Sequence, residues 1–334
     1  MRKPNSATAK PATRVANSPH FVESFSHMLV HVLGSAAGGG FPQWNCACPN
    51  CRALREGTFL GKPRTQTQVA ISNVKDGRDW FLLGASPDLR AQIEATPALH
   101  PRDGVRQSPI DGVVLANADV DHTLGLLLLR ELQPLNIYST PAVRHILRKD
   151  NSMFAMLERI PQQAVWNEFT PGKDFPLRSP SRNNAGLRCE AHSLAHHFPA
   201  YVSPDRQQQL AAGESSCGLV VSSSGKRLAF FPAVPEINQS LLNILNSADV
   251  LLFDGTFWSD DELIRIQGSG QTARQMGHVP VQETLVTLAQ LSRPRKIFLH
   301  INNTNPMLNE SGPEYRAVRA AGWEIAEDGW QLEL

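Results

Sequence analysis

The sequence predicts an α/β protein in which two β-sheets are faced by helices. Segments with strand-type patterns recur in both halves of the 334-residue chain, and helical segments lie between them. Apolar residues make up 41% of the sequence, which is enough for a substantial core. Several predicted strands run directly into short stretches of Asp, His, Asn and Gly. The strand ends are therefore the places where we look for a functional site.

The first half of the chain begins with a strand at residues 29–34, which alternates and ends in glycine. Two further apolar segments, residues 68–73 and 80–83, are joined by a turn, and two short apolar runs follow at 112–115 and 135–138. The predicted helical segments of this half are a short turn at 52–56 and helices at 87–95, 124–132 and 141–149.

The second half mixes strands and helices more evenly. The predicted strands are residues 187–194, 218–222, 227–231, 250–253 and 296–299, and the predicted helices are residues 238–247, 281–291 and 314–321. The last segment, residues 323–334, is predicted to form a terminal strand or a hairpin.

Composition and charge limit the class of protein. Residues 1–27 are rich in Ala, Ser, Asn, Pro, Lys and Arg without an apolar centre, so we expect a disordered extension, with a targeting segment as the alternative. Residues 28–334 are predicted to form one domain. With 32 basic and 31 acidic residues and no dense basic tract, the chain is not expected to bind nucleic acid. No apolar run reaches about 18 residues, so no membrane insertion is expected.

Three cysteines form a C-x-C-x-x-C cluster at Cys46, Cys48 and Cys51. An odd number of neighbouring thiols suits a metal better than disulfides, and it favours a reducing cytoplasmic location. Structural zinc is the prediction, although zinc needs a fourth ligand from elsewhere. Free thiols or a redox pair remain alternatives.

The run from Asn117 to Gly125 matches the pattern of a metal-binding turn, H-x-H-x-D-H-x-x-G, in which the first two histidines are replaced by Asn117 and Asp119. The second half of the turn, Asp121 and His122, is intact. Each half of such a turn normally supplies ligands to one metal site. Because only the second half keeps its ligands, the pattern favours a single metal over a two-metal hydrolytic site. The alternative is an ordinary turn in which Asp121 caps the leucine-rich segment that follows.

Four later stretches also carry candidate residues. The first is a histidine cluster at 192–197; the others are Asp254 at the end of an apolar strand, His278 before a helix, and His300 after an apolar strand. A surface cluster, a turn aspartate and a helix-cap histidine are the simpler explanations for the first three. For His300, the preceding strand fixes the backbone while the Asn-rich loop leaves a site open.

In this order, these features resemble the metallo-β-lactamase superfamily and, within it, the PqqB family (pyrroloquinoline quinone biosynthesis protein B). The resemblance covers residues 28–334 and rests on the motifs at 38–51, 117–125, 196–201, 253–258 and 300–306. The cysteine segment is also similar to that of cyclic phosphodiesterases of phosphonate metabolism. The implied fold is an αββα sandwich, with two mixed sheets flanked by helices and the site at one sheet edge.

The resemblance implies an active-site metal held by Asp121, His122 and His300. Two histidines and one carboxylate form the ligand set of mononuclear non-haem Fe(II) oxygenases, although zinc could use the same ligands. Hydrolytic relatives carry a further metal site, whose counterparts here are Asn117, Asp119 and His196, with His197 as the alternative to His196. Because two histidines of that site are replaced by Asn117 and Asp119, a second ion should bind weakly. The bridging aspartate of those relatives has no counterpart in residues 228–233.

Further roles follow from the same resemblance. Asp254 and His278 would form a carboxylate–histidine pair that moves protons near the metal. The relatives' fourth zinc ligand, a histidine, corresponds to Asn303, which leaves that position of the cysteine site open. The implied activity is Fe(II)-dependent hydroxylation of the cross-linked glutamate–tyrosine compound derived from the peptide PqqA. A soluble carrier of the quinone or its precursor to the periplasm, and a two-metal phosphodiesterase, are the alternatives. Contacts with other enzymes of the pathway and a homodimer are left open.

Overall fold

The computed structural model describes residues 27–73, 78–131, 133–179, 185–195 and 198–334. Their strands form two seven-stranded sheets that pack face to face. Residues 1–26 lie outside the described part, so the predicted disordered extension stays a prediction.

The first sheet has the strand order β14-β1-β2-β3-β4-β5-β6. Its strands, in that order, are Gln331–Glu333, Leu29–Gly34, Gln68–Ser72, Trp80–Leu83, Ile110–Val114, Leu135–Ser139 and Ala164–Glu168. Strands β14, β1, β2 and β3 pair antiparallel, whereas β3, β4, β5 and β6 pair parallel. The carboxyl ends of the parallel strands therefore meet at one edge.

The second sheet has the order β13-β12-β11-β10-β9-β8-β7. Its strands, in that order, are Trp323–Ile325, Arg295–Leu299, Val250–Asp254, Lys226–Phe231, Ser216–Ser223, Arg188–Ala195 and Asp174–Pro176. Strands β10 to β13 are parallel, and the β7–β10 segment is antiparallel. Each sheet therefore contains both parallel and antiparallel strand pairs, as expected for the predicted architecture.

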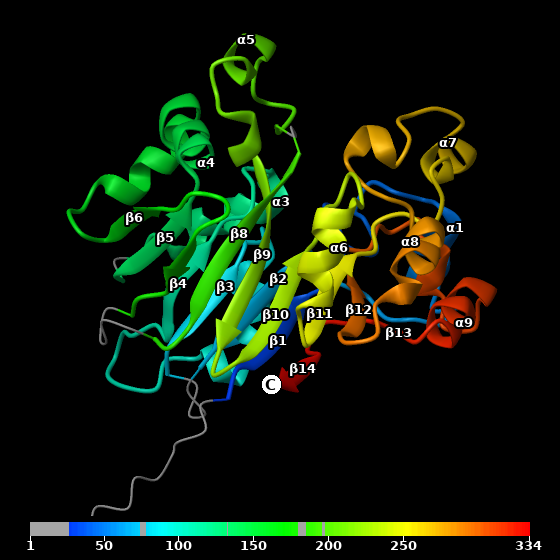
Figure 1. Ribbon diagram of the computed structural model, residues 1–334, viewed down its shortest axis with the longest axis horizontal. Coiled ribbons are helices and arrows are strands. Elements are labelled where there is room, and N and C mark those ends of the chain that lie inside the picture. Colours follow the sequence, from blue (N-terminus) through cyan, green and yellow to red (C-terminus); the bar gives the residue numbers. More distant parts are fainter. Residues whose placement is uncertain (1–26, 74–77, 132, 180–184, 196–197) are drawn as a thin grey trace, which may run out of the picture.

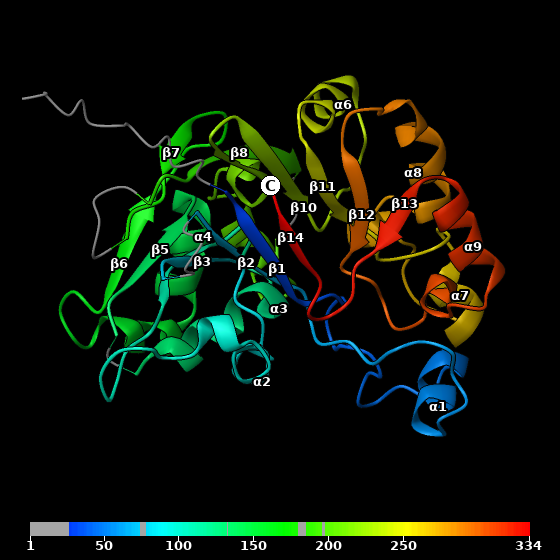
Figure 2. The ribbon, with the colours of Figure 1, turned by 90° about the horizontal axis from the view of Figure 1, so that it is seen from below.

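Helices cover the outer face of each sheet (Figure 1 and Figure 2). The α-helices are α1 (Pro49–Arg55), α2 (Leu89–Glu94), α3 (Val120–Thr123), α4 (Pro141–His145), α5 (Pro204–Gln207), α6 (Gln239–Asn246), α7 (Glu262–Gln267), α8 (Val281–Thr287) and α9 (Pro313–Ala320). Three apolar clusters result: one between the sheets, one under α2 and α4, and one under α6, α8 and α9. The predicted αββα sandwich is confirmed.

Two predicted segments differ from the structure. The α-helix predicted at residues 124–132 is wrong, because after the single turn of α3 the chain continues as a 3₁₀ helix, Leu124–Leu129; residue 132 lies outside the described residues. The Gly125 amide donates to the Ala85 carbonyl, and a Cβ at Gly125 would lie 2.3 Å from the Ser86 carbonyl oxygen. This close approach to the chain after β3 replaces regular α-helical pairing.

Residues 323–334, predicted as a terminal strand or a hairpin, form neither a single strand nor a hairpin. Strand β13 pairs parallel with β12, and β14 pairs antiparallel with β1 in the other sheet. The chain end therefore links the two sheets. Strands β6 and β7 were not predicted, because both are short and partly exposed. No helix among the described residues is long and apolar enough to cross a membrane.

Candidate metal centre

A cavity of about 790 Å³ opens at the edge where strands of both sheets end. The turn after β4 supplies Asp121 and His122, the loop after β12 supplies His300, and the segments that follow β11 and precede α8 supply Thr256 and His278. The parallel strands of each sheet end at one edge, and the two sheets pack face to face, so residues almost 180 positions apart in the chain meet here.

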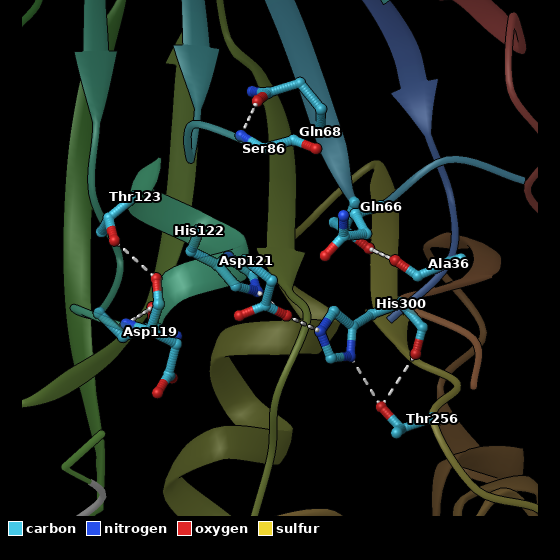
Figure 3. A network of polar contacts seen from close by, with 12 residues as sticks. Ala36, Gln66, Gln68, Ser86, Asp119, Asp121, His122, Thr123, Thr256 and His300 are labelled. Carbon is cyan, nitrogen blue, oxygen red and sulfur yellow. Dashed lines mark hydrogen bonds and ion pairs between the residues drawn. The ribbon is translucent and has the colours of Figure 1, made fainter. Parts of the chain in front are cut away.

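Asp121, His122 and His300 face one another in this cavity (Figure 3). The Asp121 Oδ2 atom lies 3.4 Å from His300 Nε2 and 3.7 Å from His122 Nε2. One donor atom from each of the three residues falls within 4.8 Å of the other two, a spacing that suits a single ion. The two histidines are buried, while Asp121 is partly accessible from the cavity.

The electrostatics of this group favour cation binding. Burial by itself would raise the pKa of the Asp121 carboxyl, but the neighbouring His122 and His300 lower it well below its usual range. Burial lowers the pKa of His122, which keeps its imidazole neutral. Burial would also lower the pKa of His300, but the hydrogen bond and charge of Asp121 raise it. An ionised carboxylate beside imidazoles is the donor set that a divalent transition metal uses.

A second layer of polar groups orients His300. Thr256 Oγ1 lies 2.8 Å from His300 Nδ1 and 2.7 Å from Asp254 Oδ1. The hydroxyl has one proton, and a carboxylate is a stronger acceptor than the nearby carbonyl oxygen of His300. Donation to Asp254 leaves the hydroxyl as acceptor for His300 Nδ1–H. With Nδ1–H held by Thr256, the Nε2 atom that faces Asp121 is the nitrogen left to bind a metal, which would take the place of the proton shared with Asp121.

Asp254 also holds His278. Its Oδ2 atom lies 2.8 Å from His278 Nδ1 and accepts a hydrogen bond from the Val234 amide at 2.9 Å. Asp254 is fully buried, and the rings of His278 and His300 lie 5.6 Å apart. One carboxylate therefore orients two imidazoles, and the Nε2 atom of each is left to the cavity.

Two backbone features make room for the centre. His300 has a φ of +57°, in the left-handed region that a non-glycine residue rarely adopts. Gly38 approaches the carboxylate of Asp121 closely, since a Cβ at this position would lie 3.2 Å from Asp121 Oδ2. A side chain at Gly38 would occupy space beside the ligand group, which explains why glycine suits this position.

The three cysteines come together about the start of α1. Their sulfur atoms fall within 4.8 Å of one another, and Cys48 caps α1 by accepting from the Cys51 amide. The Asn303 Nδ2 atom lies 3.2, 3.5 and 3.3 Å from the sulfurs of Cys46, Cys48 and Cys51. Burial raises the pKa of the Cys48 thiol to about 12, so a bound metal would have to displace its proton. The donor set fits zinc, with Asn303 beside the fourth position.

The weak second site is only partly described. Asn117 is buried, Asp119 is half-buried, and both line the cavity. The Asn117 Oδ1 atom accepts a hydrogen bond from the Asp119 amide at 3.1 Å. His196 and His197 lie outside the described residues, so the choice between them stays a prediction.

The structure brings Asp121, His122, His278 and His300 together at the cavity, and Asp254 lies behind them; that they bind a metal or take part in a reaction stays a prediction. The sequence did not single out Thr256 or Gly38. Thr256 follows Asp254 by two residues at a strand end, where hydroxyls commonly bond to a preceding carboxylate, and this spacing is a usable signal. For Gly38, the sequence shows only a run of three glycines, and the approach to Asp121 depends on tertiary structure.

Comparison with known proteins agrees with this geometry. Residues 79–301 match the Beta-lactamase superfamily domain. A diphosphatase of the PhnP family (17% identity, TM-score 0.62, covering 92% of this chain and 97% of that one) shares the fold. Human tRNase Z, short form, shares it too (15% identity, TM-score 0.53, covering 91% and 98%). Fold and site together define a protein of the metallo-β-lactamase class with a His/Asp metal centre.

Closer relatives specify the family. Coenzyme PQQ synthesis protein B of Methylorubrum extorquens (strain PA1) is 40% identical over 310 residues, which cover 92% of this chain and all of the relative. The same protein of Methylobacterium sp. (strain 4-46) is 42% identical over 313 residues, again with 92% and 100% coverage. The crystal structure of Zn(2+)-bound PqqB from Methylobacterium extorquens superposes with a TM-score of 0.83 at 38% identity, covering 92% and 100%. The chain belongs to the coenzyme PQQ synthesis protein B family.

Proposed function

We propose that this chain is an Fe(II)-dependent hydroxylase of coenzyme PQQ biosynthesis. Its substrate is the cross-linked glutamate–tyrosine compound derived from PqqA, whose tyrosine ring gains oxygen. The observation that carries the proposal is the arrangement of Asp121, His122 and His300 at an open cavity. Two imidazoles and one carboxylate that leave positions open are the ligands of non-haem iron oxygenases.

The protein residues fit this metal without further change. Asp121 is held as a carboxylate, His122 is neutral, and the contact to Thr256 directs His300 Nε2 inward. When bound, iron(II) supplies the one-electron and O₂ chemistry that no side chain here provides. The related PqqB is described as Zn(2+)-bound, which supports a metal in this family but leaves the catalytic metal of this chain as our proposal.

The surroundings of the ligands suit an aromatic substrate. Phe198, Tyr201 and Phe257 line the cavity, and its volume of about 790 Å³ accommodates a compound made of two linked amino acids. His278, oriented by Asp254, presents its Nε2 atom to the same space. In the proposed reaction, His278 accepts or returns a proton at the phenol ring, and Asp254 holds the imidazole in the required tautomer.

A two-metal hydrolase fits less well. Such enzymes place a carboxylate between the ions, and here the chain continues from β10 with Pro232 and Ala233. Ala233 lines the cavity, and the amide of Val234 is used to hold Asp254. This segment therefore offers no bridging ligand to a second ion.

The decisive experiment supplies the purified protein with Fe(II), a reductant, ¹⁸O₂ and the glutamate–tyrosine compound. We expect a product heavier by ¹⁸O, measured by mass spectrometry, and no product with Zn(II) alone. Asp121→Ala, His122→Ala and His300→Ala should each lose iron binding and hydroxylation together. A product without ¹⁸O, or equal activity with Zn(II), would reject the oxygenase and favour the hydrolase; tight binding without conversion would favour the carrier.

A further inference from the structure

We infer that Asn117 is a hydrogen-bond donor to an anionic oxygen on the ring of the bound substrate, in place of a ligand to a second metal. The inference deepens the proposed function, because it assumes that an aromatic compound with a phenolate or catecholate oxygen enters the cavity. The observation that carries it is the orientation of one buried carboxamide group.

The orientation follows from the hydrogen bond within the turn. The side chain of Asn117 is buried, and the atom facing the Asp119 amide lies 3.1 Å from that nitrogen. A backbone N–H can only donate, so the facing atom must be the amide oxygen, and the two ends of the carboxamide are thereby distinguished. The Nδ2 atom is the end that remains. Asn117 lines the cavity, and the hydrogen bond accepted by its Oδ1 atom is the one that its side chain makes with the described residues.

That remaining group is unsuited to a metal. A carboxamide nitrogen carries two protons and has no lone pair to offer, whereas its oxygen is already used by Asp119 N. Asn117 occupies the position of the first turn histidine in the metal-binding pattern, so a ligand of the pattern has become a donor. A backbone bridge between Asn117 and Ser216 fixes this position relative to the second sheet.

The composition of the cavity explains why such a donor is needed. Among the described residues that line it, there is no lysine or arginine, while Asp119 and Asp121 contribute carboxylates. An anionic ring oxygen that enters this space must avoid the carboxylates and find positive or proton-donating groups. Besides the metal, the buried amide of Asn117 offers such a group, and it is already held in position.

The test uses 4-nitrocatechol, a ring with two adjacent oxygens whose visible spectrum changes when it binds a metal. The Zn(II)-loaded full-length protein is titrated as wild type, Asn117→Ala and Asn117→Asp, and the zinc ions per chain are counted in each. Asn117→Asp keeps an oxygen for the Asp119 amide, removes the donor and adds a negative charge, whereas Asn117→Ala removes the donor without adding a charge. Asn243→Asp adds the same charge on the exposed face of α6 and is the matched control.

We expect both Asn117 variants to bind 4-nitrocatechol about tenfold or more weakly, as befits the loss of one hydrogen bond to a charged acceptor. Zinc content should be unchanged in Asn117→Ala, and Asn243→Asp should behave as wild type. Unchanged probe affinity in Asn117→Ala, or fewer zinc ions in that variant, would overturn the inference. A wild type that binds no probe would also overturn it, whereas failure of ¹⁸O incorporation with normal probe binding would reject only the oxygenase.

Discussion

Replacing Thr256 by valine tests whether the second layer controls the metal centre. Valine has nearly the shape of threonine, so packing should change little at a position that is only 3% exposed. What disappears is the hydroxyl that lies 2.8 Å from His300 Nδ1 and 2.7 Å from Asp254 Oδ1. Asp254 Oδ1 retains the Thr256 amide at 3.0 Å, whereas His300 Nδ1 loses its side-chain partner.

The size of the effect on metal binding follows from the unequal loss of hydrogen bonds at Asp254 and His300. A buried donor left without a partner costs about 1–3 kcal/mol. His300 can avoid the cost by giving up the proton on Nδ1 and keeping one on Nε2, which lies 3.4 Å from Asp121 Oδ2. A proton on Nε2 prevents this nitrogen from binding a metal. The substitution should therefore weaken metal binding more than it lowers the stability of the fold. We expect the active centre to bind metal about 10- to 100-fold more weakly, the usual effect of changing a group that holds a metal ligand.

The assay is a competition titration of Co(II) or Zn(II) against a chelator, combined with thermal unfolding. Thr284→Val in α8 is the control, because Thr284 is fully buried and its hydroxyl has no hydrogen-bond partner in the part of the chain that the structure describes. That control should bind metal as wild type and be at least as stable. If Thr256→Val binds metal as tightly as Thr284→Val does, the proposed orientation of His300 is wrong.

Three further predictions concern other parts of the molecule. His278→Ala should keep the active-centre metal, measured by elemental analysis, and lose roughly a hundredfold in hydroxylation rate, the upper range being about 10⁴. Cys48→Ser should lose zinc from the cysteine cluster and, in the same titration, bind the active-centre metal more weakly; unchanged affinity there would separate the two sites. Burial raises the pKa of Glu262 from 4.5 to about 7, so the folded protein retains a proton that the unfolded chain loses. Stability should therefore fall as pH rises from about 4.5 to 7 and level off above it. The Glu262→Gln side chain stays neutral at every pH. In urea unfolding, the free energy of unfolding of this variant minus that of the wild type should therefore rise by up to about 3 kcal/mol between pH 5 and pH 8. An equal pH dependence of the two proteins would contradict this prediction.

The sequence could place the candidate residues near one another because they follow buried strands. Asp121 and His122 come after β4, Asp254 ends β11, and His300 comes directly after β12. Apolar runs locate such strands, and parallel strands bring their carboxyl ends together, so residues far apart in sequence could be assigned to one place. The same argument gave most strands of both sheets within one or two residues.

The errors arose where distant pairing decides the structure. Nothing local in residues 323–334 shows that Trp323–Ile325 joins one sheet and Gln331–Glu333 the other. The 3₁₀ helix at Leu124–Leu129 depends on contact between Gly125 and the chain after β3, which a helical pattern does not reveal. The role of Thr256 likewise depends on where His300 lies in space, since 44 residues separate them.

The loop after β12 explains why the two predicted metal sites should depend on each other. His300 faces the active centre, and three residues later Asn303 faces the three sulfurs. The loop is fixed from the cysteine side by Asn50 of α1, whose amide donates to the carbonyls of Asn303 and Asn305 at 3.1 Å each. These contacts surround His300, whose left-handed backbone is a strained conformation that neighbouring contacts must support. Zinc bound at the cysteines would strengthen the contacts on the cysteine side of the loop. Loss of this zinc should therefore alter the position of His300 through the loop backbone, while both sheets stay folded.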